Sequence, residues 1–420
     1  MEKSRKPKIR FRGYTDDWEQ REFSEMFDCT ISNNTLSRSE LSYEEGSILN
    51  IHYGDILIKY GSILDIHKYK IPRIPNEKKE DFRGSLLQPG DIVIADTAED
   101  ETTGKACEIG SLFGNRIVAG LHTMVARPNI EMASGYLGYY LNSNAYHCQL
   151  LPMMQGIKVL SLSRANVKKT ALKFPKSTKE QQLIANYFIQ LDDLITLHQR
   201  KLDKLINVKK SMLEKMFPKQ GSTVPEIRFT GFTNDWEQRK LGELLTRYTD
   251  EVNVPHNGYE RLGIRSHAKG TFHSYVSEGH ELQTGKMHKV AADKFIVNIT
   301  FGWEHAVAVT DKNDAGKLVS HRFPQYSLSE NLYSKFFKYI ILDDKFKHHL
   351  WLSSPGGAGR NRVLKLDEML EYKIKIPNVQ EQQKIAEVLM DLDHLITLHQ
   401  RVKSLKTDII TRKGVLNNGI

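Results

Sequence analysis

The stretch EQQLIANYFIQLDDLITLHQR, Glu180 to Arg200, decides the organisation of this chain because it returns as EQQKIAEVLMDLDHLITLHQR, Glu381 to Arg401. The two copies share 14 of 21 residues. A second block behaves in the same way, since IRFRGYTDDWEQR (Ile9 to Arg21) returns as IRFTGFTNDWEQR (Ile227 to Arg239) with 10 of 13 residues kept. The chain therefore contains a duplicated frame.

The segments inside this frame, about 22–174 and about 240–376, have no obvious kinship with each other. Constant connectors around unlike bodies indicate one task performed twice on two different targets. A chain of 420 residues suits two to three domains, and PKQGSTV (Pro218 to Val224) has the composition of a linker. We predict four segments: a first recognition domain at 1–176, a first spacer helix at 177–217, a linker with a second recognition domain at 218–378, and a second spacer helix at 379–420.

Composition narrows the class of protein. Apolar residues make up 40% of the chain and charged residues 26%, which is ordinary for a globular protein. No apolar run approaches the ~18 to 20 residues of a membrane span, and the basic N-terminus lacks the apolar region of a signal peptide. Three widely spaced cysteines predict a reducing, cytoplasmic location without a disulfide frame or a CxxC zinc site. The net charge of +9 favours a polyanionic partner.

Each repeated block beginning with EQQ opens a long helix. Apolar residues step by alternating fours and threes, which is the heptad spacing of a coiled-coil seam. Pro175 and Pro218 bracket the first helix, and Thr178 with Gln181 predicts its N-cap and capping-box partner. At ~1.5 Å per residue this helix is roughly 60 Å long.

We predict that the two helices pair with each other, antiparallel, as a coiled coil. The alternative is that each helix packs on its own globular half. His198 and His399 occupy equivalent positions and are expected to be structural polar residues, and the lysines of the first helix a solvated face. The predicted seam, which also serves subunit docking, consists of Ile184, Phe188, Leu191, Ile195, Leu202, Leu205, Ile385, Leu389, Leu392, Leu395, Val402 and Leu405.

The two bodies combine short strand-like runs, such as GDIVIAD (Gly90 to Asp96) and DKFIVNITFGW (Asp293 to Trp303), with an aromatic helix-like segment. The fold class predicted for the whole chain is mixed α/β (α+β), with two domains of similar fold, two long antiparallel helices and a pseudo-twofold internal repeat.

Both bodies end in a glycine-containing basic stretch, QGIK (Gln155 to Lys158) and GGAGRNR (Gly356 to Arg362). Glycine beside a basic residue lets the backbone approach a phosphate while side chains reach a base edge. A flexible surface turn is the alternative for a single motif, and its recurrence in both halves favours DNA contact. The predicted DNA-binding residues are Lys105, Arg116, Gln155, Lys158, Arg265, Lys269, Arg360, Asn361 and Arg362.

No catalytic or metal site is predicted. GHELQTGKM (Gly279 to Met287) imitates a phosphate loop but has one residue too many between its glycines and Met in place of Ser or Thr. The sequence lacks a GxGxxG opening a helix, an NPPY- or DPPY-like methyltransferase motif and an HExxH pattern. The chemistry expected of this chain is therefore binding.

The ensemble resembles the specificity (S) subunits of Type I restriction–modification systems. The resemblance rests on RFxGxxxDWEQR before each body, EQQxIAxxLxxLDxLITLHQR after each body and KMFPK (Lys215 to Lys219) at the end of the first repeat. It covers the whole chain. The second helix departs from the pattern because it ends in RKGVLNNGI without a KMFP-like terminus.

The resemblance implies that each body is a target recognition domain reading one half of a bipartite DNA target. The helices would set the spacer and dock two modification (methyltransferase) subunits, and restriction (translocase–nuclease) subunits would join outside. S-adenosylmethionine, ATP and magnesium would belong to those partners, so this chain would bind no cofactor. The remaining alternative is a non-enzymatic two-module scaffold that does not recognise DNA sequence.

Overall fold

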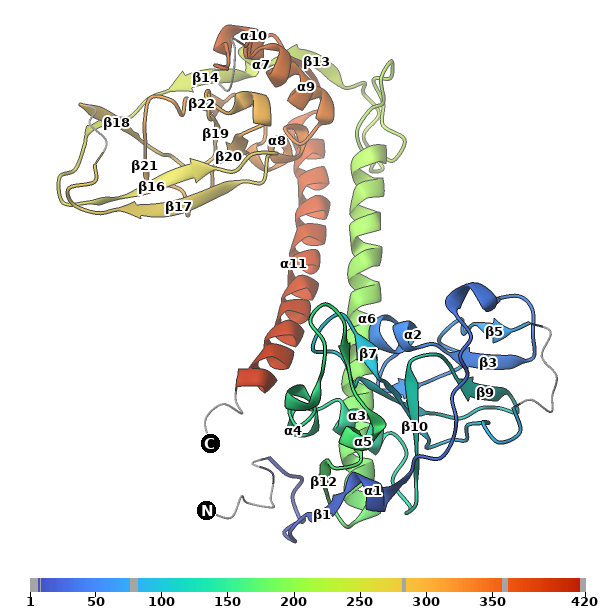
Figure 1. Cartoon of the computed structure of the whole chain (residues 1–420). Helices are drawn as coiled ribbons and strands as arrows, with labels where there is room; N and C mark the ends of the chain where they lie inside the picture. Colours follow the sequence, from blue (N-terminus) through green and yellow to red (C-terminus); the bar gives the residue numbers. More distant parts are fainter. Residues whose placement is uncertain (1–6, 8, 76–81, 282–284, 357–361, 416–420) are drawn as a thin grey trace. The chain divides into compact units, whose positions relative to one another are not determined.

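The structure, a computed structural model, describes residues 7, 9–75, 82–281, 285–356 and 362–415, with residues 402–415 described as helix backbone only (Figure 1). It divides into two compact units, one of Met1–His198 with Lys403–Ile420 and the other of Gln199–Val402. Each unit contains one of the two bodies. The long helices α6 (Thr178–Lys215) and α11 (Val379–Val415) contribute to both units.

The body of the first unit is built on two sheets that are joined by short helices. The helices are α1 (Phe23–Met26), α2 (Tyr53–Ile58), α3 (Tyr136–Leu141), α4 (Asn144–His147) and α5 (Arg164–Val167). The five-stranded sheet has the order β2 (Phe27–Asp28), β10 (Thr123–Pro128), β6 (Ile92–Ala95), β8 (Ala106–Ile109), β4 (Ile63–Leu64). The three-stranded sheet has the order β5 (Arg73–Ile74), β3 (Ile48–Ile51), β9 (Arg116–Ala119), and a two-stranded ladder joins β11 (Leu160–Ser161) to β7 (Thr97–Ala98).

Strand β6 shows why this body folds as it does. All four residues of its IVIA sequence are buried. Because successive side chains of a strand point to opposite faces, Ile92 and Ile94 enter one core with the aromatic residues of α3, whereas Val93 and Ala95 enter another core with β3 and β9. The sheet is therefore covered on both faces.

The body of the second unit repeats the arrangement with different strands. Its helices are α7 (Leu241–Leu244), α8 (Ser334–Ile340), α9 (Asp344–Leu352) and α10 (Leu366–Leu370). The four-stranded sheet has the order β14 (Leu245–Tyr248), β22 (Gln325–Leu328), β19 (Lys294–Val297), β20 (Val307–Val309). The five-stranded sheet has the order β15 (Glu251–Asn253), β18 (Lys286–Lys289), β21 (Leu318–Val319), β16 (Tyr259–Ile264), β17 (Thr271–Val276). The mixed α/β class is confirmed.

The repeated blocks form a closed frame around each body. In the first unit β1 (Glu19–Glu22) pairs antiparallel with β12 (Ala171–Phe174), and in the second β13 (Glu237–Lys240) pairs antiparallel with β23 (Lys373–Ile376). The register is the same, since the first residue of the leading strand faces the last residue of the trailing strand in both. Each body thus begins and ends at adjacent strands.

The start of α6 differs by one residue from the prediction. Thr178 is the first helical residue, and the Ser177 hydroxyl accepts a hydrogen bond from the backbone N–H of Glu180 at 3.4 Å, so Ser177 takes the capping position. Gln181 is not a capping-box partner, because its side chain donates to the carbonyl of Pro175 at 2.8 Å.

The two helices run antiparallel within the second unit, where α11 lies beside the C-terminal part of α6 (Figure 1). The Lys209 ammonium on α6 lies 2.6 Å from a carboxylate oxygen of Asp393 on α11. Met216 from the end of α6 joins the same core as Ile385 from the start of α11. The position of each contact rises on one helix as it falls on the other, which confirms the predicted direction.

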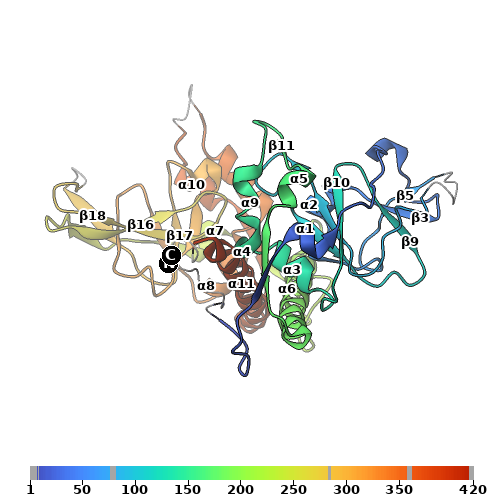
Figure 2. The same ribbon diagram turned by 60° about the horizontal axis from the view of Figure 1, so that its bottom comes forward.

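The alternative packing, of each helix on its own body, also holds at the helix beginnings. Ile184 packs against the core of the first body, and the Phe188 ring stacks on Tyr139 of α3 at 5.3 Å between centroids. Figures 1 and 2 both show α3 against α6. In the second unit Ile385 and Leu389 belong to the core of that body. The heptad stripe is therefore shared between a body at its start and the other helix further along.

Candidate nucleic-acid interface

Two clamps, each present in both halves of the chain, hold each body in its frame, and the first clamp is an ion pair. The Arg10 guanidinium donates to both carboxylate oxygens of Glu180 at 2.6 and 2.8 Å, and Arg228 does the same to Glu381 at 2.8 and 2.8 Å. Both glutamate side chains are 1% exposed. The glutamate bond raises the pKa of each arginine above its ordinary value, so both remain cationic. The bidentate geometry fixes the lead-in against the helix start.

The second clamp is a glutamine. The Gln181 side-chain oxygen accepts from the backbone N–H of Ala133, and the Gln382 oxygen accepts from the backbone N–H of Tyr333, both at 2.9 Å. Ala133 and Tyr333 belong to the bodies, which share no obvious sequence. The residues EQQ of the repeated block therefore hold the lead-in with Glu and the body with the first Gln.

The glycine-containing basic stretches occupy equivalent places in the two bodies. An isolated antiparallel bridge joins Gln155 to Ser161 in the first, and another joins Gly356 to Arg362 in the second. Each bridge encloses five residues. A Cβ atom at Gly156, where φ is +126°, would lie 1.9 Å from the carbonyl oxygen of Val159, so only glycine fits this turn. We name these segments the first and second basic loops, 155–161 and 356–362.

In the second body, two segments that are distant in sequence meet close to Arg362. The turn between β16 and β17 is tied to η3 (Gly302–Glu304), since the N–H groups of His267 and Ala268 donate to the carbonyls of Glu304 and His305 at 2.9 and 2.8 Å. His267, Ala268 and His305 adopt left-handed backbone conformations, with φ of 61°, 50° and 63°. Such backbone is costly for residues other than glycine and gathers at functional surfaces.

Arg362 connects the second basic loop to this junction. Its guanidinium lies 5.9 Å from the ring centroid of Trp303 in η3 and 5.1 Å from that of Trp351 in α9. The Trp303 indole donates to the carbonyl of Thr300 at 3.2 Å, which fixes the ring. A cleft of about 440 Å³ is lined by both tryptophans, Asp344, Lys347 and His348. Stacking on aromatic rings holds an arginine in place while its N–H groups remain available.

The predicted residues of the second body thus converge in part. Arg265 and Lys269 are exposed on the β16–β17 turn, and Arg362 reaches η3, to which that turn is bonded. Arg360 and Asn361 lie outside the described residues. Trp303 and Trp351 were not among the predicted site residues. Both tryptophans lie near basic residues only because the fold brings them there. The one sequence signal that could have identified Trp351 is its place on the exposed face of an amphipathic helix.

The predicted residues of the first body converge less well. Gln155 and Lys158 are exposed on the first basic loop. That loop is tied to β7, because its last residues, Leu160 and Ser161, pair antiparallel with Ala98 and Thr97. His122, a half-exposed ring 3.5 Å from the Asp96 carboxylate, lies nearby and was missed by the sequence analysis because nothing local marks it.

Lys105 and Arg116 lie elsewhere in the first body. The Lys105 ammonium donates to the carbonyls of Leu57 and Tyr60 at 3.0 and 3.2 Å, and burial lowers its pKa. Such a lysine ties α2 to β8 and has little reach toward a ligand. Arg116 begins β9 and donates to the Ser47 hydroxyl. DNA contact by either residue stays a prediction, with Lys105 the less favoured of the two.

The seam residues fall into different environments. Leu202 is buried, and Leu191, Ile195, Leu205 and Leu392 are half-buried. Leu395 is exposed rather than buried, and the side chains of Val402 and Leu405 lie outside the description. Leu395 belongs to a repeated apolar pair of the LITL motif that is between 37% and 62% exposed: Leu194, Leu197, Leu395 and Leu398. We name the pair Leu194 and Leu197 on α6, and likewise the pair Leu395 and Leu398 on α11, the leucine face of that helix.

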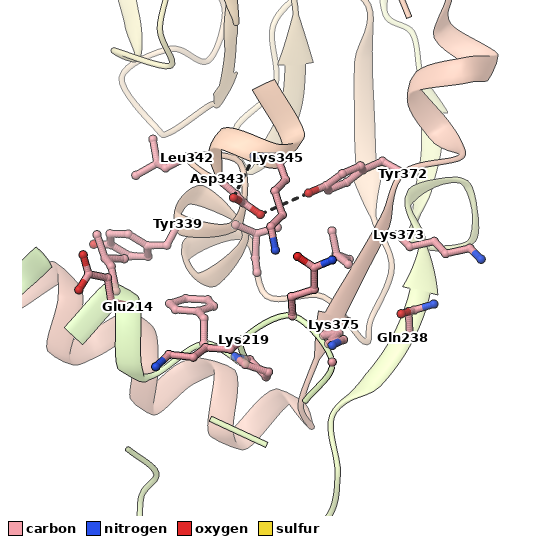
Figure 3. Close-up of a pocket in the computed structure, with 17 residues that line it drawn as sticks. Glu214, Lys219, Gln238, Tyr339, Leu342, Asp343, Lys345, Tyr372, Lys373 and Lys375 are labelled. Carbon is pink, nitrogen blue, oxygen red and sulfur yellow. Dashed lines mark hydrogen bonds between the residues drawn. The ribbon is translucent and has the colours of Figure 1, made fainter. Parts of the chain in front are cut away.

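A cleft of about 590 Å³ lies where the end of α6 meets the second body (Figure 3). Lys219, Lys345, Lys373 and Lys375 line it. At its inner wall Asp343 accepts from the Tyr372 hydroxyl at 3.3 Å and caps α9 through the backbone N–H of Lys345 at 3.0 Å. The described lining residues include no His, Cys or Ser. The cleft can attract anions, but its residues do not form an acid–base or nucleophilic arrangement.

The rest of the described chain adds no further chemistry of these kinds. Within the ranges given above, no three His, Cys, Asp or Glu side chains come together in a way that could hold a metal ion. In the same part of the chain, no helix has the length and apolarity needed to cross a bilayer.

Comparisons with known proteins agree with this geometry. The family model "Type I restriction modification DNA specificity domain" matches residues 15–207 and again residues 233–406. The putative type I restriction enzyme MjaX specificity subunit of Methanocaldococcus jannaschii is 24% identical over 407 residues, covering 92% of this chain and 89% of that protein. The MjaVIII specificity subunit of the same organism is 22% identical over 240 residues, 54% of this chain and 56% of that protein.

Among solved structures, the S subunit of a Type-I restriction-modification system from M. genitalium has the same fold. Its TM-score is 0.53 at 11% identity, with 97% of each chain covered. The subunits described by the family model recognise DNA, are non-catalytic and carry no cofactor of their own. With two matched regions that together span most of its length, this chain belongs to the DNA specificity subunits of Type I restriction–modification systems.

Proposed function

We propose that each body reads one half of a bipartite DNA target. The observation that carries this proposal is that two unlike bodies are held in the same frame. Strand register, arginine–glutamate clamp and glutamine clamp are equal in the two halves, whereas the sheets differ in strand number and order. The frame holds each body in the same way, whereas the bodies differ from each other. This arrangement suits two bodies that each recognise their own DNA sequence.

The reading surface of the second body would consist of the β16–β17 turn, η3 and the second basic loop. Arg265, Lys269 and Arg362 supply donors there, and arginine pairs with the acceptors of guanine in the major groove. In the first body the first basic loop, with Gln155 and Lys158, takes the corresponding part. Arg360, Asn361, Arg116 and Lys105 remain candidates of lower rank.

The helices would serve as a spacer and as the docking surface for partners. The leucine face occurs once in each half, so it offers two equivalent apolar surfaces for two modification (methyltransferase) subunits. Restriction subunits would join that complex. S-adenosylmethionine, ATP and magnesium would act in those partners, in the cytoplasm. The boundaries that we propose are 1–176, 177–217, 218–378 and 379–420.

The scaffold alternative without DNA recognition has lost its support, because the matching family model is a DNA specificity domain. The proposal itself is tested by exchanging one body. The segment Arg239 to Pro377 is replaced by the corresponding body of another member of the family, and methylated sites are mapped across a genome that carries the cognate methyltransferase. One half of the target should change and the other should stay, since separate contacts contribute nearly additively.

Replacing the segment 22–174 instead is the matched control, and it should change the opposite half. A target whose two halves change together in either hybrid would contradict independent reading by the two bodies.

A further inference from the structure

Asp393 joins three elements of the second unit. One of its carboxylate oxygens accepts from the Tyr339 hydroxyl at 2.9 Å, and the other lies 2.6 Å from the Lys209 ammonium. Tyr339 belongs to α8 of the body, Asp393 to α11 and Lys209 to α6. Lys209 also lies 5.7 Å from the centroid of the Tyr339 ring. We name these three residues the latch.

The latch lies where the body is attached to the helices. Tyr339 is buried, and it lines one end of the lysine cleft of Figure 3. Burial, and then its bond to Asp393, raise the pKa of Tyr339, so its hydroxyl remains a donor at any physiological pH. Both oxygens of the carboxylate are engaged by different elements. A change in the angle of the body on α11 would have to break one of these charge-assisted bonds.

The first half repeats part of this arrangement. The Tyr139 hydroxyl donates to Asp192 at 2.8 Å, and Asp192 and Asp393 occupy the same position of the repeated LDxLITLHQR motif. Tyr139 and Tyr339 stand six residues after Ala133 and Tyr333, which bond to the glutamine clamps. In the repeat register the position equivalent to Lys209 is Ile410. A tyrosine–aspartate contact is thus common to both halves, and the lysine belongs to the second.

Spacing between half-sites is sensitive to small movements of a reading surface. One base pair adds about 3.4 Å along the DNA axis, so a tilt that shifts the second body by that amount would fit a gap longer or shorter by one pair. The arginine–glutamate clamp and the paired frame strands hold the ends of the body, and the glutamine clamp holds the residue directly before α8. The latch is the hydrogen-bonded contact that ties α8, in the middle of the body, to both helices, beside the apolar packing of Phe336 and Phe337 on Ile385 and Leu389.

We propose that Tyr339, Asp393 and Lys209 are positioning residues, which fix the angle of the second body on the helix pair and thereby set the length of the gap between the half-sites. The inference rests on the proposed function, because it assigns residues to the spacing that the helices impose. None of the three residues belongs to the proposed reading surface, so the bases recognised should not depend on them.

The experiment uses the full chain assembled with its methyltransferase subunits, and genome-wide mapping of methylated sites. Tyr339→Phe removes the hydroxyl and keeps the ring. We expect both half-sites to be unchanged, while methylation at gaps one base pair longer or shorter rises about tenfold relative to the native gap, the factor for one charge-assisted hydrogen bond. Tyr372→Phe is the control, because it removes a tyrosine–aspartate bond within the same body and should leave the gap unchanged.

Lys209→Met provides a second variant that keeps the Tyr339–Asp393 bond, and it should relax the gap in the same direction, with Lys209→Arg restoring it. A lower melting temperature with an unaltered gap distribution in both variants would overturn the positioning role. A wild-type complex that accepts many gaps between two intact half-sites would overturn this inference alone, whereas one that recognises no second half-site would overturn the proposed bipartite reading and this inference with it.

Discussion

Arg10 and Glu180, which lie 170 residues apart in sequence, form a two-pronged ion pair around the first body. The pair is repeated by Arg228 and Glu381 around the second. The ion pair holds the lead-in against the start of the helix. The sequence of the body between them can therefore vary without changing this attachment. A buried carboxylate of this kind depends on its arginine, because an unpaired charge in the same place would be strongly unfavourable.

Removing the arginine of this pair should destabilise the first unit. Arg10→Ala leaves the Glu180 carboxylate buried without its partner, so we expect a lower melting temperature of the first unit in calorimetry. Arg21→Ala is the control, since Arg21 pairs with Glu19 on the surface and should have a much smaller effect. Equal losses in the two variants would contradict a central role of the clamp.

Replacing two leucines of α11 should affect two different properties, stability in one case and subunit assembly in the other. Leu389 is fully buried in the core of the second body, so Leu389→Ala should lower the free energy of unfolding by about 2–5 kcal/mol. Leu398 belongs to the leucine face, so Leu398→Ala should change it by no more than about 0.5 kcal/mol and should weaken the binding of methyltransferase subunits. Denaturant unfolding and co-purification measure the two effects. If the complex still assembled fully after all four leucines of the two leucine faces were replaced, these faces would be excluded as the docking surface.

The length of the helices should determine the gap. Inserting one heptad after Arg200 and another after Arg401, at equivalent positions of the repeat, keeps both stripes in phase and adds about 10.5 Å. The gap between half-sites should grow by roughly three base pairs at about 3.4 Å each. Methylation mapping would reveal it, with both half-sites unaltered. A gap of the original length would mean that the helices do not set the spacing.

The second unit should lose stability on mild acidification because of His305. This ring is buried, and its Nε2 atom lies 2.7 Å from the carbonyl oxygen of Ile341. Burial lowers the pKa of His305, although the bond to Ile341 opposes this. Stability is therefore complete above the unfolded-state pKa of about 6.5 and is lost as the pH falls from there through the lower folded-state value.

Melting temperatures recorded between about pH 7.5 and 5.5, a window around the ordinary histidine pKa, test this prediction. His305→Gln should reduce the acid-side loss, whereas His348→Gln, on an exposed side chain of α9, should leave it unchanged. An identical pH dependence of wild type and His305→Gln would exclude this histidine as the cause.

Arg362 should affect only one half of the target. Arg362→Ala removes donors from the surface that it shares with Trp303, and we expect a loss of about 1–3 kcal/mol in DNA binding with relaxed choice at one position of one half-site. Arg116→Ala in the first body is the comparison. Binding titrations at a fixed salt concentration, with each half-site mutated in turn, measure both. If Arg362→Ala weakened the binding of all DNA sequences equally, Arg362 would contact a phosphate and not a base.

Much of this architecture follows from the sequence. The duplicated blocks mark the two frames, and the heptad spacing marks two long helices, because each pattern is local and recurs. The repeat also made the functional class recognisable. The basic loops could be found in the same way, since Gln155 and Gly356 stand in the same register before the repeated helix.

Other features were decided by tertiary structure. A heptad shows which residues share a face but not what covers them, so Phe188 against Tyr139 and the exposure of Leu395 could not be read from spacing. Lys105 has the positive charge that DNA binding requires, yet in the fold its ammonium donates to two backbone carbonyls. The junction of Arg362 and Trp303 depends on hydrogen bonds between distant segments, which no local pattern encodes. The sequence by itself determined the frame, because a frame is made of repeated local contacts; only the folded chain determined the reading surface, because that surface is assembled from segments far apart along it.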